Sequence, residues 1–231
     1  MRMLAIATLR VNETFASMQG EGTFIGTPSF FIRLDGCPLR CAWCDTPYAL
    51  EGDRGVETPV ERLADAAAGL HHVVITGGEP LAQDIGALVD LLAPWHHVTV
   101  ETSGTIFADL PCVSLFSISP KVGSSGYAPR PVTLARYCAT AAGRMQLKFV
   151  IADERDMREA LVCVEGLNSV LPPKTPIVLQ PESGSAGHGE RYLETLRQMS
   201  ESVIAEPRWR AFAVQVLPQL HYLLWGGVPG R

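Results

Sequence analysis

Three cysteines that could bind one metal centre lie within eight residues of the chain. Cys37, Cys41 and Cys44 form a C-x3-C-x2-C pattern. A closed zinc site or an ordinary iron–sulfur cluster uses four protein ligands, so three thiolates leave one coordination position open. Two simpler interpretations are a zinc knuckle and an electron-transfer cluster whose fourth ligand lies elsewhere in the chain. His71 and Cys112 are candidates for that ligand.

Glycine-rich and polar motifs follow several apolar segments of the chain. They are TGGEP at 76–80, ETSG at 101–104, SPK at 119–121 and LQPESGSAG at 179–187. Ligand sites of parallel α/β folds lie at the carboxyl ends of the strands, so these motifs and the cysteines should meet at one rim. Paired glycines let the backbone approach a ligand closely, and the adjacent Glu79 can accept hydrogen bonds from an ammonium group. A simple zinc knuckle has no use for such a rim.

Apolar strands and amphipathic helices alternate along the chain, which predicts a parallel sheet with right-handed crossovers. About six strands are too few for a closed eight-stranded barrel. We therefore predict a single α/β domain over 1–231, an open, partial TIM-like barrel of about six parallel strands with helices outside. The first helix should begin with a capping box made by Thr58 and Glu61, with Pro59 at its first position. Strands are expected at 29–35, 72–76, 98–101, 114–119, 146–151, 176–180 and 212–217, and further helices at 83–92, 133–142, 153–164 and 190–203.

Bulk composition argues against several functional classes. The net charge of −5 gives no electrostatic reason to expect nucleic acid or an anionic membrane. Residues 1–11 lack the length of a signal peptide, and no apolar run reaches the roughly 18 residues of a membrane span. Cys112, Cys138 and Cys163 lie scattered in apolar surroundings, as expected for core thiols in a reducing compartment. We expect a cytoplasmic protein.

The cysteine motif, with Trp43 before its last thiol, resembles the C-x3-C-x-aromatic-C signature of radical S-adenosylmethionine (SAM) enzymes. Further motifs narrow the resemblance: E-x-F-x-S-x-QGEG from Glu13, G-x-P-x-FFIRL-x-GC from Gly26, CDT after the last thiol, and Gln-Leu-His at 219–221. Together they resemble the 7-carboxy-7-deazaguanine synthase family over nearly the whole chain, to about Trp225. The resemblance implies a radical SAM fold that contracts the ring of 6-carboxy-5,6,7,8-tetrahydropterin, with loss of ammonia, in queuosine and 7-deazapurine biosynthesis.

The resemblance also implies a set of site residues and cofactors. A [4Fe–4S] cluster, SAM and Mg²⁺ are expected, with a 5′-deoxyadenosyl radical abstracting hydrogen and no side chain assigned as acid or base. The three cysteines would bind the cluster and Thr46 the Mg²⁺. Contacts to the cofactor are expected from Trp43, Asp45, Gly78, Glu79, Ser103, Ser119, Lys121 and Gln180, and contacts to the substrate from Gln19, Glu21, Arg33, Thr76 and His221.

Arg33 has a physical argument of its own. Strand alternation places Arg33 and Asp35 on the face opposite Phe30, Ile32 and Leu34. A guanidinium inside a barrel is costly unless it meets an anion. The family's substrate carries a carboxylate that a guanidinium could hold through two hydrogen bonds.

Other functions and partners are implied or left open. A glycyl-radical-enzyme activating enzyme would share the cluster, SAM and size, but has no evident need for the QGEG loop, Arg33 or His221. An electron carrier or metal-binding module would need no SAM rim. The resemblance implies a pterin substrate, a reducing electron donor such as flavodoxin or ferredoxin, and a homodimer. It leaves open whether the carboxylate of Arg231 reaches the substrate.

Overall fold

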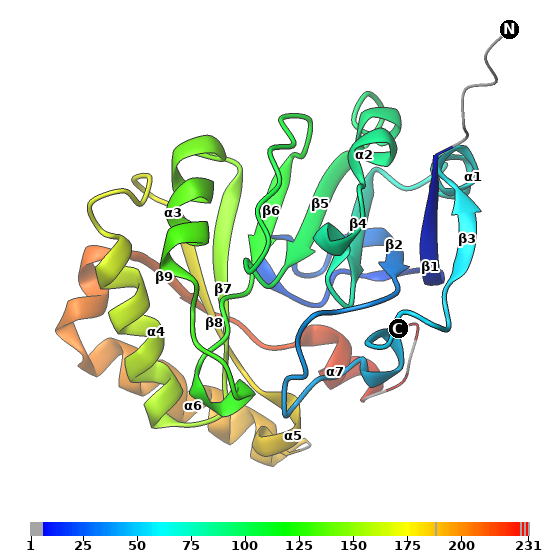
Figure 1. Ribbon diagram of the computed structural model, residues 1–231. Helices are drawn as coiled ribbons and strands as arrows, with labels where there is room; N and C mark the ends of the chain where they lie inside the picture. Colours follow the sequence, from blue (N-terminus) through cyan, green and yellow to red (C-terminus); the bar gives the residue numbers. More distant parts are fainter. Residues whose placement is uncertain (1–6, 188, 227, 229, 231) are drawn as a thin grey trace, which may run out of the picture.

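The computed structural model describes residues 7–187, 189–226, 228 and 230, and its centre is one nine-stranded sheet (Figure 1). The strands lie in the order β3-β1-β2-β4-β5-β6-β7-β8-β9. Their bounds are β1 Thr8–Met18, β2 Pro28–Leu34, β3 Val56–Pro59, β4 His72–Gly77, β5 His97–Thr102, β6 Leu115–Ile118, β7 Met145–Ile151, β8 Pro176–Pro181 and β9 Ala213–Val216. The helices are α1 Val60–Ala66, α2 Gly86–Leu92, α3 Pro131–Thr140, α4 Glu154–Leu167, α5 Ser183–Ala186, α6 Glu190–Ala205 and α7 Leu220–Trp225.

The strands from β2 to β9 form an open, partial barrel. Neighbours in the run β2-β4-β5-β6-β7-β8-β9 are all parallel, so the sheet has seven parallel strands. They correspond to the seven strand ranges expected from the sequence, although the barrel as a whole was predicted to have about six. The sheet does not close, because β3 and β9 are its two edges. Helices α3, α4 and α6 lie together along one side of the sheet (Figure 1). The predicted fold class is confirmed.

The two faces of the sheet differ in chemistry. On one face, side chains such as Ile32, Ile75 and Leu147 are fully buried in a single apolar core with the helices. The other face carries polar side chains, among them Arg33 on β2 and Lys148 on β7, and faces the inside of the partial barrel. Because side chains alternate along a strand, each strand supplies both the core and the interior.

The amino-terminal part of the sheet was not predicted. Strand β1 runs antiparallel to β2 and to β3, so the parallel sheet carries an antiparallel extension. The capping box was wrong: Thr58 belongs to β3, and its hydroxyl donates to the carbonyl of Val56 at 3.0 Å. Pro59 is the N-cap of α1 and makes no side-chain cap. Because Thr58 pairs with Leu9 of β1, this segment adopts an extended strand conformation, although its local sequence favours the start of a helix.

All six cysteines are free thiols. Cys138 is buried and Cys163 packs against the core, as predicted, but Cys112 is exposed. The prediction of a core position was therefore wrong for Cys112. In the part of the chain that the structure describes, no helix has the length and apolar character that crossing a membrane requires.

Candidate active site

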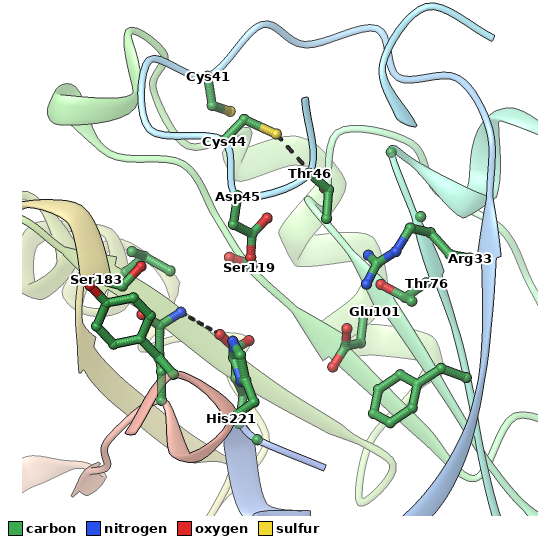
Figure 2. A pocket seen from close by; sticks show the side chains of 18 of the residues that line it. Arg33, Cys41, Cys44, Asp45, Thr46, Thr76, Glu101, Ser119, Ser183 and His221 are labelled. Carbon is green, nitrogen blue, oxygen red and sulfur yellow. Dashed lines mark hydrogen bonds between the residues drawn. The ribbon is translucent and has the colours of Figure 1, made fainter. Parts of the chain in front are cut away.

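A cavity of about 370 Å³ lies inside the partial barrel, at the carboxyl ends of the parallel strands. Figure 2 shows side chains from the cysteine loop, from the ends of several strands and from α7 around it. Most residues expected at the site do line it: Gln19, Glu21, Arg33, Cys37, Cys41, Trp43, Cys44, Asp45, Thr46, Thr76, Gly78, Ser103, Ser119, Lys121 and His221. Glu79 and Gln180 do not line the cavity, nor do His71 and Cys112.

The cysteine loop suits a cluster better than a single ion. Cys37, Cys41 and Cys44 all line the cavity and are partly exposed. Within the described residues, no three His, Cys, Asp or Glu side chains come together as ligands of one metal ion. A cubane instead takes one thiolate on each of three irons, so its cysteine sulfurs need not converge on one point. The three thiols and the cavity beside them therefore fit a [4Fe–4S] cluster with one open iron. Burial raises the pKa of Cys37 and of Cys41, so cluster binding must release their protons.

The paired glycines at the end of β4 hold the cysteine loop against the sheet. Gly77 has φ of +150°, and a Cβ there would lie 2.3 Å from the carbonyl oxygen of Leu34. A Cβ on Gly78 would lie 2.4 Å from the carbonyl oxygen of Gly36 and 2.6 Å from that of Ala49. Only glycine fits this close approach of three backbone segments. The glycines thus serve the loop that carries the thiols as well as the cavity itself.

Glu79 acts on the cavity through its neighbours. Its side chain is fully buried, and its carboxylate accepts hydrogen bonds from Thr102 Oγ1 at 2.8 Å, Ser103 N at 2.9 Å and the hydroxyl of Ser103. Ser103 in turn lines the cavity. The carboxylate therefore orients Ser103, and a direct contact between Glu79 and a cofactor stays a prediction.

Three of the expected cofactor contacts lie side by side. Lys121 Nζ lies 5.2 Å from the centre of the Trp43 ring and donates to Ser119 Oγ at 3.2 Å. Trp43 Nε1 donates to Ser124 Oγ at 2.8 Å, which fixes the ring. Asp45 lines the same cavity as Ser119 (Figure 2). This wall combines one cation with hydroxyl groups and an aromatic face.

Thr46 closes the cysteine loop toward the cavity. It is buried, and its Oγ1 lies 3.8 Å from Cys44 Sγ. Its carbonyl accepts from the amide of Ala49 at 3.0 Å, which begins a short 3₁₀ turn. The hydroxyl is available to the cavity, and a Mg²⁺ ion on it stays a prediction.

Arg33 points into the cavity and lies beside Thr76, its partner in the register of β2 and β4 (Figure 2). Its Nε donates to Glu13 Oε1 at 2.7 Å, and the same oxygen accepts from Tyr48 Oη at 2.9 Å. Burial acts to lower the pKa of Arg33, but Tyr48 and Glu13 outweigh it and the pKa is raised. None of the described residues is hydrogen-bonded to its two terminal nitrogens, which leaves them for an anionic ligand.

Asp35 does not share this position. It follows the end of β2, and its carboxylate accepts from the backbone of Arg54 at 3.0 Å and Gly55 at 2.6 Å and from Asn12 Nδ2 at 3.1 Å. The expectation that Asp35 and Arg33 point to the same interior face was therefore wrong. Asp35 holds loop backbone outside the cavity lining.

Glu21 is the centre of a polar cluster whose other members, Lys148, Gln180 and Gln219, are buried. Lys148 Nζ donates to its Oε2, and Gln180 Nε2 and Gln219 Nε2 donate to its Oε1 at 2.7 and 2.6 Å. Burial alone would raise the pKa of Glu21, but Lys148, His221 and Gln219 lower it to about 2. Gln180, which was expected to contact the cofactor, therefore binds Glu21, a residue expected to contact the substrate, and does not itself line the cavity.

The QGEG loop and the carboxyl-terminal helix meet at His221. A Cβ on Gly20 would lie only 2.0 Å from His221 Nδ1, so glycine is required for the imidazole to lie there. The amide of Leu220 donates to the carbonyl of Gly20 at 2.8 Å. Gln19, in the same QGEG loop, donates from its Nε2 to Glu101 Oε1 at 2.9 Å. Two motifs about 200 residues apart in the sequence therefore form one wall.

Four functional residues were missed from the sequence. Glu13 forms an ion pair with Arg33, and Lys148 forms one with Glu21. Glu101 accepts a hydrogen bond from the amide of Gln19, and Gln219 donates one to Glu21. A lysine inside the apolar strand MQLKFVI was a usable signal, because a buried charge needs a reason. The role of Arg231 falls outside the described residues.

Comparisons with known proteins agree with this site. The family model described as the Radical SAM superfamily matches residues 31–122. The 7-carboxy-7-deazaguanine synthase of Pyrobaculum aerophilum is 34% identical over 99% of this chain and 100% of its own. The chain belongs to this family.

Further similarities extend over nearly the whole chain. The family member of Halobacterium salinarum is 35% identical over 96% of this chain and 92% of its own. The crystal structure of QueE from Escherichia coli has a TM-score of 0.66 at 30% identity, covering 90% of this chain and 93% of that one. The chain is therefore a radical SAM lyase, and family membership implies a [4Fe–4S] cluster and SAM. The activating-enzyme alternative is not favoured.

Proposed function

We propose that this protein converts 6-carboxy-5,6,7,8-tetrahydropterin into 7-carboxy-7-deazaguanine, with loss of ammonia, as a step of queuosine and 7-deazapurine biosynthesis. One observation supports this best. The three-cysteine loop opens onto a cavity lined by a carboxylate, Glu21, and by a guanidinium, Arg33, whose terminal nitrogens have no hydrogen-bond partner among the described residues. A small ligand with a carboxylate at one end and N–H donors at the other complements these two groups.

Residues of the loop and rim hold the cofactors. Cys37, Cys41 and Cys44 would hold the cluster, which with SAM would supply the radical chemistry for hydrogen abstraction. Lys121 is suited to a carboxylate of the cofactor, and Trp43 and Asp45 close the same wall. The remaining contacts come from Gly78, from Ser103 as oriented by Glu79 and from Ser119, whereas Gln180 acts on the cavity through Glu21.

Interior side chains orient the pterin. The free nitrogens of Arg33 bind its carboxylate in a charge-assisted fork. Glu21 accepts from N–H groups of the ring, and Gln19, Thr76 and His221 complete the pocket. The barrel excludes water from the reacting carbon, which protects a radical from quenching.

Mg²⁺ is proposed on Thr46. One protein hydroxyl is enough for Mg²⁺ when the other ligands are waters and substrate oxygens. Thr46 lies between the thiols and the cavity, where a metal could polarise the substrate carboxylate. Thr46→Ala should weaken the activation of the enzyme by Mg²⁺ while the cluster absorbance stays intact. Thr46→Ser, which keeps a hydroxyl group, should retain the activation by Mg²⁺.

The cellular setting is proposed from the sequence. We place the protein in the cytoplasm as a homodimer, reduced by a donor such as flavodoxin or ferredoxin, with its product passing to tRNA modification. The free thiols suit a reducing compartment.

Anaerobic reconstitution tests the function. The protein is loaded with iron and sulfide, reduced with dithionite, and given SAM with or without the tetrahydropterin. We expect 5′-deoxyadenosine to form in proportion to a deazaguanine acid, and deuterium at C6 of the pterin to appear in deoxyadenosine. Cys41→Ala is the control that lacks the cluster. SAM cleavage that leaves the pterin unchanged would refute the substrate assignment.

A further inference from the structure

Lys148 is a cation inside a strand that is buried along its whole length. All seven residues of β7 are buried, and the Lys148 side chain is 8% exposed. It lines the cavity, and its ammonium group pairs with Glu21. A buried lysine is costly unless it is paired, so this position needs an explanation beyond packing.

The hydrogen bonds around Glu21 leave little room for a ligand. A carboxylate has about four acceptor positions. Gln180 and Gln219 occupy both positions on Oε1, and Lys148 occupies one on Oε2. One position on Oε2 therefore remains for a group in the cavity.

The two glutamines are oriented for an ionised carboxylate. Both turn their amide nitrogens toward Glu21, and the amide oxygens of Gln180 and Gln219 have no hydrogen-bond partner among the described residues. A protonated Glu21 would instead offer a donor to one of these oxygens. The arrangement favours the anion at the cost of two unpaired oxygens.

Charged groups face this pair from several elements. Glu101 of β5 and Asp45 of the cysteine loop act on Lys148, and His221 of α7 acts on Glu21. The acidic groups raise the pKa of Lys148 although burial lowers it, so the ammonium stays charged. Lys148 is the cation that donates directly to Glu21.

We propose that Lys148 is a positioning residue for substrate binding: it holds Glu21 ionised and turned so that one acceptor position faces the substrate's N–H groups. This inference rests on the proposed function, because the amino-pyrimidinone edge of a pterin supplies such donors. An analogue with oxygen in place of the 2-amino group would present lone pairs to the carboxylate and bind more weakly.

Binding of the tetrahydropterin to the reconstituted enzyme with SAM but no reductant tests the proposal. Calorimetric Kd values are measured anaerobically between pH 5 and pH 8 for wild type, Lys148→Met and Lys148→Arg. In Lys148→Met the burial of Glu21 is no longer offset, so its protonated fraction should rise as pH falls. We expect the ratio of variant to wild-type Kd to grow about tenfold over this range. Lys148→Arg should restore most of the wild-type profile.

His221 is unchanged in every variant, so the ratio compares only the substitutions at Lys148. Lys174→Met removes the same charge from an exposed position and should change nothing. A ratio that is equal at every pH would mean that Lys148 supports only the structure, and the inference would be wrong.

A second variant covers the case in which Lys148→Met does not fold. Glu21→Gln combined with Lys148→Met removes both charges; it should fold, bind the pterin weakly and follow the wild-type pH profile. Wild-type affinity in this double variant would overturn the inference.

Infrared spectra give an independent readout, since a protonated carboxyl band at pH 5 is expected for Lys148→Met and absent from the double variant. If wild type binds no pterin while that band appears, the proposed function fails and the link between Lys148 and Glu21 survives.

Discussion

The two ends of the barrel interior use polar residues in opposite ways. At the carboxyl ends of the strands, Arg33 and Glu21 are only partly exposed, charged and left with unused hydrogen-bonding capacity. At the amino ends, His72 is fully satisfied: its Nδ1 pairs with Ser29 Oγ at 2.7 Å and its Nε2 with Thr99 Oγ1 at 2.8 Å. Phe24 covers the barrel interior at these amino ends, with its ring centre 4.9 Å from that of His72. We call these regions the rim and the base.

One segment connects the rim and the base. Residues 19–24 run along the inside of the sheet, where Gln19 bonds Glu101, Glu21 bonds Lys148, and the amide of Thr23 donates to Gln146 at 2.9 Å. Lys148 and Gln146 are two residues apart on β7 and therefore face the same side. The comparison teaches that a single strand can hold a charge for a ligand and, two residues earlier, a neutral amide that seals the barrel.

The largest expected effect separates the two regions by pH. Burial and the nearby His97 lower the pKa of His72 to about 4, below its ordinary value of 6.5. The unfolded chain therefore binds a proton more readily, and stability is full above pH 6.5 and lost as pH falls toward 4. We expect His72 to cost up to about 3 kcal/mol over this interval.

Urea unfolding at several pH values measures this loss, with His72→Asn as the control that keeps a polar group but does not titrate. Glu21 should contribute at lower pH, since its pKa near 2 gives stability that is lost between about pH 4.5 and 2. If the free energy of unfolding falls equally with pH in wild type and His72→Asn between pH 6.5 and 4, then His72 is not held uncharged at the base of the barrel.

Arg33→Ala should affect the rim and leave the base intact. Loss of a charge-assisted fork removes about 2–3 kcal/mol of binding, so KM for the pterin should rise roughly 30- to 150-fold. Cluster absorbance and the unfolding midpoint should change little. Arg210→Ala, at an exposed position, is the matched control. Loss of cluster incorporation would show that Arg33 supports the cysteine loop instead of the substrate.

Phe24→Ala should do the reverse. The ring packs on His72 and also on His97, whose ring centre is 4.4 Å away. Its removal opens a cavity and should lower the free energy of unfolding by about 2 kcal/mol. Phe24→Leu should lose less, and KM at a temperature where the protein is folded should stay within about twofold of wild type. A large KM change with unaltered stability would erase the distinction between base and rim.

The sequence predicted the rim better than its support. Cysteine spacing, the paired glycines and Arg33 are local signals, because each shows its chemistry within a few residues. The partners of the buried charges are not local: Glu21 and Lys148 are 127 residues apart, and Glu13 meets Arg33 only because β1 pairs antiparallel with β2. Strand β1 itself was missed because its interior residues are mixed in polarity. Thr58 was assigned to a helix cap because the local sequence favours one, but pairing with β1 overrides that propensity and places Thr58 in β3. Nothing in the sequence placed Phe24 over two histidines from different strands.

Gly20→Ala gives the smallest effect and tests how the segment joins the rim to α7. The added Cβ would lie 2.0 Å from His221 Nδ1, so the imidazole must move while the backbone bond from Leu220 to Gly20 can remain. We expect KM to rise about fivefold to tenfold, equal to about 1–1.4 kcal/mol, with stability nearly unchanged. The position of His221 causes this loss, so Gly20→Ala in a His221→Ala background should add little further. Gly166→Ala, where a Cβ meets no atom within 4 Å, is the control for the substitution itself. Fully additive effects of Gly20→Ala and His221→Ala would mean that the two residues act independently and that α7 is not positioned through the QGEG loop.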